Sequence, residues 1–135
     1  MKLRKTLIKS AISNSKAYKL ARRKFCFLTI NSVSTLEQII SFIEIILRYP
    51  VHRISSIYLW PKILTKICGG RLRFPISGGG AIAPHIDSFF EALGVELLVG
   101  YGLTETSPVL TCRRPWRNIR GGAGQPLPET EIKIV

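Results

Sequence analysis

The chain has 135 residues, which is room for one small domain or for a piece of a larger one. Its hydrophobic fraction of 46% supports a folded core, and the scattered Cys26, Cys68 and Cys112 match neither a disulfide framework nor a metal-ligand spacing, so we expect reduced, mostly buried thiols. Residues 1–74 hold 15 Lys and Arg against 2 Asp and Glu, whereas residues 75–135 hold 5 against 6.

The charge distribution, a basic half before a near-neutral half, narrows the choice of partner. Nucleic-acid modules usually interleave stacking aromatics with their charges. The first 24 residues, however, hold nine Lys and Arg and a single aromatic, Tyr18. We therefore expect no nucleic-acid partner. An anionic membrane surface, an acidic protein and an ordinary solvated face stay open as explanations of the basic half.

The basic half is predicted to be helical. Residues 3–28 place apolar side chains at helical spacing, and residues 52–68 form a further helix that is kinked or restarted at Pro61. The first 34 residues contain no acid, a composition similar to that of an organellar transit peptide. We favour a basic amphipathic helix that belongs to the domain, because the basic character continues well past any cleavage point.

A second helix is predicted to begin at Ser34 or Thr35, with Glu37 in its first turn, and to end at Pro50. Its apolar stripe consists of Leu36, Ile39, Ile40, Ile43, Ile46 and Leu47, and it is too short and too interrupted by charge to cross a bilayer. The helix at 52–68 carries a second stripe, which we interpret as a core face rather than a membrane anchor. The second stripe consists of Ile54, Ile57, Tyr58, Ile63, Leu64 and Ile67.

The near-neutral half changes to strand signals. Residues 72–77 and 95–99 are predicted strands, and residues 85–93 between them form a short helix. Strand, Gly-rich loop, helix and strand make a βαβ unit with parallel strands. Ligands of such sheets bind beyond the carboxyl ends of the strands, where two unusual loops, 78–83 and 100–107, fall.

The end of the chain is looser. Residues 108–120 hold four arginines and no acid, and residues 121–124 form a glycine-rich turn. Residues 130–135 alternate like a strand with one solvated face. The fold class predicted from these elements is α/β.

The segment from Gly100 to Thr106 combines groups that can grip ATP with its metal. The Tyr101 ring can stack on a purine, the Thr104 hydroxyl can contact a phosphate, and the Glu105 carboxylate can hold Mg²⁺, which prefers oxygen ligands. A plainer interpretation is a strand and turn in which Thr and Glu cap a helix.

The glycines at 78–80 fit neither the dinucleotide fingerprint nor the P-loop pattern. A backbone shelf for an adenine, with Tyr101 on the other side, is the more natural use.

Two motifs together resemble the acyl-adenylate-forming (AMP-dependent synthetase/ligase) superfamily. They are Ser77-Gly78-Gly79-Gly80-Ala81-Ile82-Ala83-Pro84 and Gly100-Tyr101-Gly102-Leu103-Thr104-Glu105-Thr106-Ser107-Pro108. The Thr-Ser-Pro after the glutamate, the 121–126 stretch and the 130–135 ending are most similar to long-chain fatty acid ligases. Within these, the plant plastid and cyanobacterial acyl-CoA or acyl-acyl-carrier-protein synthetases are the nearest resemblance.

The resemblance implies a role for each matching residue. Gly79, Gly80 and Ala81 match the backbone that lies against the adenine, and Tyr101 matches the aromatic on its other face. Gly102, with Gly100, would shape the turn beside the acyl carboxylate. Thr104 matches the contact to the α-phosphate and Glu105 the Mg²⁺ ligand, so these two are the implied catalytic residues.

The resemblance also implies what the polypeptide is. Residues 1–74 would be the basic helical segment of the large N-terminal AMP-binding domain and residues 75–135 its β-loop-α-β core, with no C-terminal domain. ATP and Mg²⁺ would be cofactors, a long-chain fatty acid the substrate, and coenzyme A or the phosphopantetheine of acyl carrier protein the acceptor. The expected location is cytoplasmic or peripheral to a membrane, or the plastid for a plant or alga.

The departures from the family are as informative. The chain lacks the Lys-Gly phosphate loop, the ribose-binding aspartate and the catalytic lysine, and Glu129 stands where the family commonly has glycine. We therefore expect an inactive fragment of a ligase. The alternatives are a non-enzymatic basic module that binds anionic membrane or acyl carrier protein, and a general nucleotide-binding module.

Overall fold

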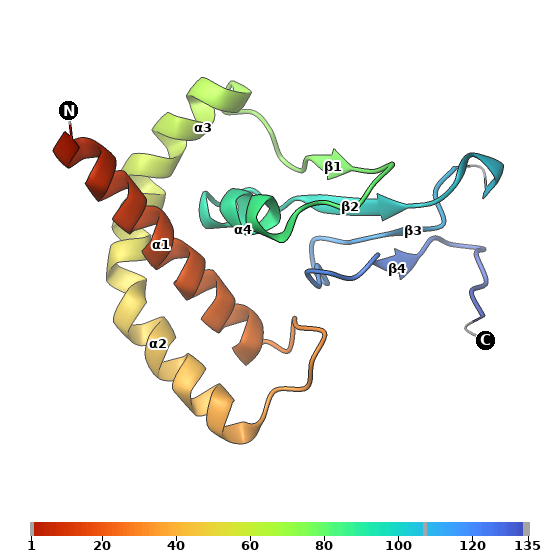
Figure 1. Ribbon diagram of the computed structural model, residues 1–135, viewed down its shortest axis with the longest axis horizontal. Helices are drawn as coiled ribbons and strands as arrows, with labels where there is room; N and C mark the ends of the chain where they lie inside the picture. Colours follow the sequence, from red (N-terminus) through yellow and green to blue (C-terminus); the bar gives the residue numbers. More distant parts are fainter. Residues whose placement is uncertain (1, 107, 134–135) are drawn as a thin grey trace.

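The computed structural model describes residues 2–106 and 108–133, so the predictions for Ser107, Ile134 and Val135 lie outside it (Figure 1). Helices form one side of the molecule and a small sheet the other, with α4 between them. The elements are α1 (Lys2–Phe25), α2 (Thr35–Ile54), the π-helical turn η1 (Ser55–Leu59), α3 (Trp60–Cys68), β1 (Ile76–Ser77), α4 (Pro84–Ala92), β2 (Leu98–Tyr101), the 3₁₀ turn η2 (Thr104–Thr106), β3 (Thr111–Cys112) and β4 (Gln125–Pro126).

The start of α2 confirms the predicted cap. The Ser34 hydroxyl accepts from the Glu37 amide at 3.3 Å, and the Ser34 amide donates to the Glu37 carboxylate at 3.2 Å. This reciprocal capping box satisfies two donors that the first helical turn cannot pair. Ser34, rather than Thr35, is the capping residue.

The predicted end of α2 at Pro50 is wrong, because the helix continues through Pro50 to Ile54. The His52 ring in this last stretch stacks on Tyr18 of α1 with a centroid separation of 4.2 Å. Its Nδ1 also lies 3.0 Å from the Ser15 hydroxyl. These contacts to α1 hold the helix past the proline. The predicted restart at Pro61 is confirmed, since α3 begins at the buried Trp60 with Pro61 in its first turn.

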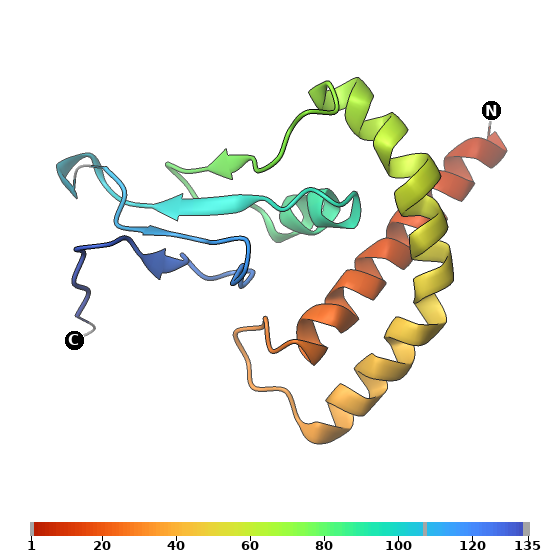
Figure 2. The same ribbon diagram turned by 180° about the vertical axis from the view of Figure 1, so that it is seen from behind.

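The core face predicted for residues 52–68 is wrong, because Ile54, Ile57, Tyr58 and Ile67 are all exposed. Ser41 and Ser55 are the buried residues of α2 and η1, and α2 packs along α1. The apolar stripe of α2 is exposed as well. Its exposed fractions are Leu36 73%, Ile39 54%, Ile40 58%, Ile43 51%, Ile46 57% and Leu47 72%. Figure 2 shows α2 as the outer helix of the pair.

The sheet confirms the βαβ prediction. β1 and β2 are parallel neighbours, with Ile76 opposite Leu98, and α4 connects them. β3 and β4 extend the sheet in antiparallel fashion, so its order is β1-β2-β3-β4. A cluster of buried apolar residues lies where α4 meets β2, namely Ala92, Leu93, Val95, Leu97, Leu98 and Val99.

Three strand boundaries differ from the predictions. The strand predicted at 72–77 is limited to Ile76–Ser77, and the one at 95–99 starts only at Leu98, because the Val95 amide still donates to Phe90 of α4. Residues 130–133 form no strand. Glu129 just before them has φ +65°, the left-handed conformation that favours glycine.

The cysteine prediction is half right. All three thiols are free, but Cys26 is exposed and Cys68 and Cys112 are partly exposed, so none is buried. Each cysteine lies in a loop, at a helix end or on a short strand, positions that the sheet core does not cover. Within residues 2–106 and 108–133, no helix has both the length and the apolarity needed to cross a bilayer.

Candidate functional site

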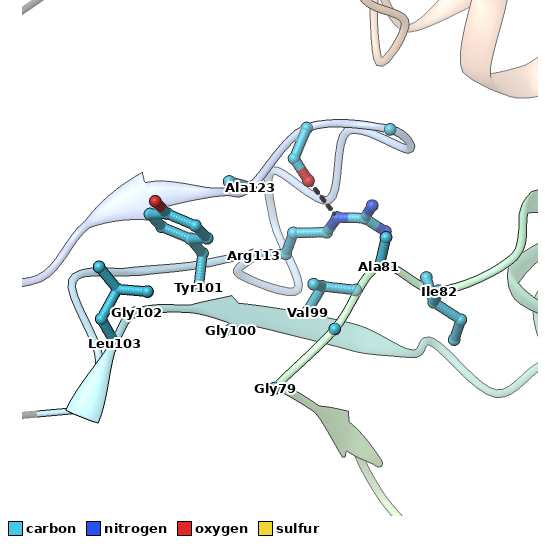
Figure 3. A pocket seen from close by; sticks show the side chains of 13 residues that line it. Gly79, Ala81, Ile82, Val99, Gly100, Tyr101, Gly102, Leu103, Arg113 and Ala123 are labelled. Atoms are coloured by element: carbon cyan, nitrogen blue, oxygen red, sulfur yellow. Dashed lines mark hydrogen bonds between the residues drawn. The ribbon is translucent and has the colours of Figure 1, made fainter.

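A cavity of about 440 Å³ lies at the carboxyl ends of β1 and β2 (Figure 3). The lining comes from the loop after β1, the end of β2 with the loop that follows it, the glycine-rich turn near the end of the chain, and one arginine after β3. These are residues 79–82, 99–103, 121–123 and Arg113. The two loops singled out in the sequence therefore share one cavity, at the sheet edge where α/β proteins bind ligands.

The first wall is a glycine ledge. Gly79 has φ +77°, which favours glycine, and a Cβ added to Gly79 or Gly80 would meet no atom within 4 Å. A side chain here would therefore project into open space rather than into packed protein. Bare backbone at this wall leaves room for a flat ring to approach closely.

Tyr101 stands on the opposite part of the cavity. It is the last residue of β2, and its side chain is 51% exposed. In Figure 3 the Tyr101 ring and the Ala81 methyl group lie on either side of Arg113. Gly79, Gly80, Ala81 and Tyr101 are thus brought together, and an aromatic face is available to a bound ring.

Gly102 has a packing reason of its own. A Cβ on Gly102 would lie 1.8 Å from the Pro108 carbonyl oxygen and 2.8 Å from the Val109 Cα. No side chain fits there without moving backbone. Gly102 therefore lines the cavity at a point where its backbone passes very close to the backbone of Pro108 and Val109.

Thr104 and Glu105 lie outside the cavity lining. Both are exposed on η2, one or two residues beyond Leu103, which is a lining residue. The turn is closed by Thr106, whose hydroxyl accepts from the Leu103 amide at 2.9 Å. No ion pair joins the Glu105 carboxylate to another described residue, so it is free to meet a cation at the rim.

Arg113 is a charged lining residue that the sequence interpretation missed. It follows β3, is 3% exposed, and donates from Nη1 to the Asp87 carboxylate at 2.8 Å and from Nε to the Gly122 carbonyl at 2.8 Å. Asp87 lies on α4 and is 2% exposed. The pattern was visible as four arginines without an acid at 108–120, opposite two carboxylates one helical turn apart at 87 and 91.

A chain of buried charges runs from this pair to α1. Arg120 contacts Glu91 and lies 3.8 Å from Asp87, and Arg23 of α1 binds Glu91 at 2.7 Å. Burial, more than any neighbouring charge, lowers the pKa values of Arg23 and Arg120. Three guanidinium groups face two carboxylates, so the cluster carries a net positive charge beside the cavity.

The metal-binding capacity of the described residues is limited. No cluster of three or more His, Cys, Asp and Glu side chains occurs within residues 2–106 and 108–133. Mg²⁺ in proteins usually takes one or two carboxylates together with substrate phosphates and water.

The fold is a mixed α/β slice with a cavity at the carboxyl ends of its parallel strands. Residues 16–135 match the family model described as AMP-binding enzyme, and the chain belongs to that family.

The curated relatives include two chloroplastic proteins of Arabidopsis thaliana. One is a long-chain-fatty-acid–[acyl-carrier-protein] ligase, AEE15, 47% identical over 66% of this chain and 12% of the relative. The other is the probable acyl-activating enzyme 16, 45% identical over 64% of this chain and 12% of the relative. Long-chain-fatty-acid–CoA ligase 1 of Schizosaccharomyces pombe is 41% identical over 55% of this chain and 11% of the relative. This chain thus spans about an eighth of their length, and no solved structure matches it.

Proposed function

We propose that the chain is the adenine-binding slice of the AMP-binding domain of a long-chain fatty acid ligase. The observation that carries this proposal is the shared cavity of the glycine ledge and Tyr101. In the full reaction the fatty carboxylate attacks the α-phosphorus of ATP and pyrophosphate leaves. A thiol of coenzyme A or of acyl carrier protein then attacks the acyl carbon and AMP leaves. Residues 1–74 and 75–135 would be two segments of that one domain.

The proposed roles follow the geometry of the cavity. The backbone of Gly79, Gly80 and Ala81 lies against one face of the adenine, and the Tyr101 ring against the other. Thr104 and Glu105 at the rim would contact the phosphates beyond the purine, with Glu105 as a ligand of Mg²⁺. Orientation and charge neutralisation would be the contributions of this slice to catalysis.

The adenine contact is tested by binding AMP to the purified chain. Tyr101→Ala should weaken AMP binding by about tenfold, because stacking of a base on an aromatic contributes about 1–3 kcal/mol. Tyr101→Phe keeps the ring and should bind like the parent chain. Equal loss in both variants would point to the hydroxyl, and equal binding in both would remove Tyr101 from the site.

The isolated 135-residue chain should not catalyse palmitate-dependent ATP–pyrophosphate exchange. Groups that act as a unit lose activity together when some are missing, and this sequence has no Lys-Gly phosphate loop and no family lysine. Robust exchange by the purified chain would refute inactivity. A Glu105→Gln variant then distinguishes true activity from a contaminating enzyme, because only true activity would fall with it.

Location and acceptor follow from the relatives by analogy. The two Arabidopsis relatives are described as chloroplastic, one of them as an acyl-carrier-protein ligase. We infer a plastid location if the source is a plant or alga, and a cytoplasmic or peripheral membrane location otherwise. Thioester formation with coenzyme A and with acyl carrier protein, compared in a full-length parent enzyme, identifies the acceptor.

A second candidate function, peripheral binding to an anionic membrane, is favoured by the exposed face of α2. At about 100° per residue, the apolar stripe is centred opposite Ser41 and His52, which face α1. The exposed Arg53, Lys62 and Lys66 follow it along the chain. An apolar face with basic neighbours is the pattern of a helix that lies in a membrane interface.

Vesicles of phosphatidylglycerol and phosphatidylcholine test this candidate. Retention at low salt that is lost both at high salt and in the double variant Ile43→Ser, Leu47→Ser supports membrane contact. If high salt releases the chain from the vesicles but the double variant is still retained, binding depends on charge alone. Capture by acyl carrier protein instead of vesicles would favour the acidic partner, and no retention of any kind removes both.

A further inference from the structure

Arg113 places a buried positive charge in the wall of the cavity. A guanidinium out of water is costly unless a carboxylate compensates it. Asp87 supplies that carboxylate at 2.8 Å, and both side chains are at most 4% exposed. The pair joins the end of β3 to the first turn of α4, directly after the glycine ledge.

The same guanidinium holds the loop on the other side of the cavity. Its Nε donates to the Gly122 carbonyl at 2.8 Å, and the Thr111 hydroxyl donates to the neighbouring Ala123 carbonyl at 2.8 Å. Figure 3 shows the Arg113 side chain between Ala81 and the loop that carries Gly122. One planar group with fixed donors thus connects two walls.

We propose that Arg113 is a positioning residue of the nucleotide cavity, which fixes the 121–124 loop at its distance from the glycine ledge by binding Asp87 and the Gly122 carbonyl together. This inference rests on the proposed function and extends it to a residue outside both sequence motifs. Arg113 acts through the loop backbone that lines the cavity. Loosening the loop should weaken nucleotide binding, because the ligand would then have to order the loop on binding.

Conservative substitution separates positioning from stability. Arg113→Lys keeps the positive charge beside Asp87, but one ammonium group cannot reproduce both contacts of the planar fork. Arg113→Met removes both contacts. Arg23→Met breaks the far end of the same charge cluster without touching the cavity lining, and Arg117→Met removes an exposed charge as a matched control.

AMP affinity and thermal unfolding are measured for the 135-residue chain and these variants. We expect Arg113→Lys to melt well above Arg113→Met and yet bind AMP about tenfold more weakly than Arg117→Met, because AMP then has to order a loop that has lost one charge-assisted hydrogen bond. Arg113→Met should lose both stability and affinity. Arg23→Met should lose stability while AMP affinity, measured where the chain is folded, stays unchanged.

Two outcomes would overturn the positioning role. The first is parental AMP affinity in Arg113→Lys. The second is a loss of affinity in Arg23→Met as large as that in Arg113→Met, which would make the effect one of general stability. If the parent chain itself binds no AMP, the proposed function fails together with this inference. Parental binding with insensitive Arg113 variants rejects the inference alone.

Discussion

The sheet region and the helical region of this molecule bury their residues in opposite ways. Around the cavity, buried charges are paired and the close crossings are made by glycine, as at Arg113 and Gly102. In the helix pair, serines and alanine face inward while the α2 stripe faces outward. The sheet region therefore pairs the charges that it buries, whereas α2 retains an apolar face that can contact something else.

The largest loss of stability is expected at Gly102, where two backbone segments of the sheet region pass closest to each other. Gly102→Ala should destabilise this region by more than about 3 kcal/mol, because its Cβ would overlap the Pro108 backbone. Gly80→Ala places its Cβ in open space and should cost less than about 1 kcal/mol. Urea unfolding curves compare the two, and similar losses would show that the crossing is less tight than described.

The second largest loss of stability is expected at Glu91, whose ion pair with Arg23 joins the helical region to the sheet region. Glu91→Gln should lower stability by about 3 kcal/mol, because it leaves Arg23 and Arg120 without their shared carboxylate. Glu131→Gln removes an exposed carboxylate and serves as the control. Unfolding that stays within about 0.5 kcal/mol of the control would mean that the buried cluster does not hold α1 to α4.

Substitutions in the exposed apolar stripe of α2 should, in contrast, leave stability almost unchanged. Leu47→Ser should change stability by less than about 0.5 kcal/mol and improve solubility, because the side chain is 72% exposed. A loss of about 2–5 kcal/mol would be the result for a core leucine. That loss would contradict the outward orientation of the α2 stripe.

A pH dependence is expected at the helix pair, where His52 packs against α1. Burial, followed by repulsion from Lys19 and Arg22, lowers the pKa of His52 from 6.5 to about 4. The folded chain therefore keeps His52 neutral where the unfolded chain takes up a proton. Stability from this group is complete above pH 6.5 and is lost as the pH falls from 6.5 towards 4.

His52→Gln should flatten this part of the stability profile, since glutamine does not titrate. Urea midpoints between pH 7 and 5 give the comparison, a range that lies above the ordinary titration of Asp and Glu. An unchanged slope in the variant would assign the pH dependence to another group.

Local signals were sufficient for several elements. The cap at Ser34 or Thr35, the restart at Pro61 and the parallel pairing of the two strands that α4 connects depend on short-range patterns, and all three are confirmed. The two motifs could also be placed at one sheet edge, because parallel strands bring their carboxyl ends together.

The errors came from contacts that a local pattern does not contain. Pro50 ends a helix by its own chemistry, yet the stacking of His52 on Tyr18 extends α2 beyond it. A stripe such as Ile54 and Ile57 reveals a helix but not the direction in which that helix turns it. Arg113 was missed because its partner, Asp87, lies 26 residues away in the sequence.

The account depends most on a purine held between the ledge and the phenol ring. Amide chemical shifts of the ¹⁵N-labelled chain, recorded during a titration with AMP, test this directly. Changes concentrated at Gly79, Gly80, Tyr101 and Gly122 are predicted. No change up to millimolar AMP, or changes confined to the basic surface of α1, would contradict it.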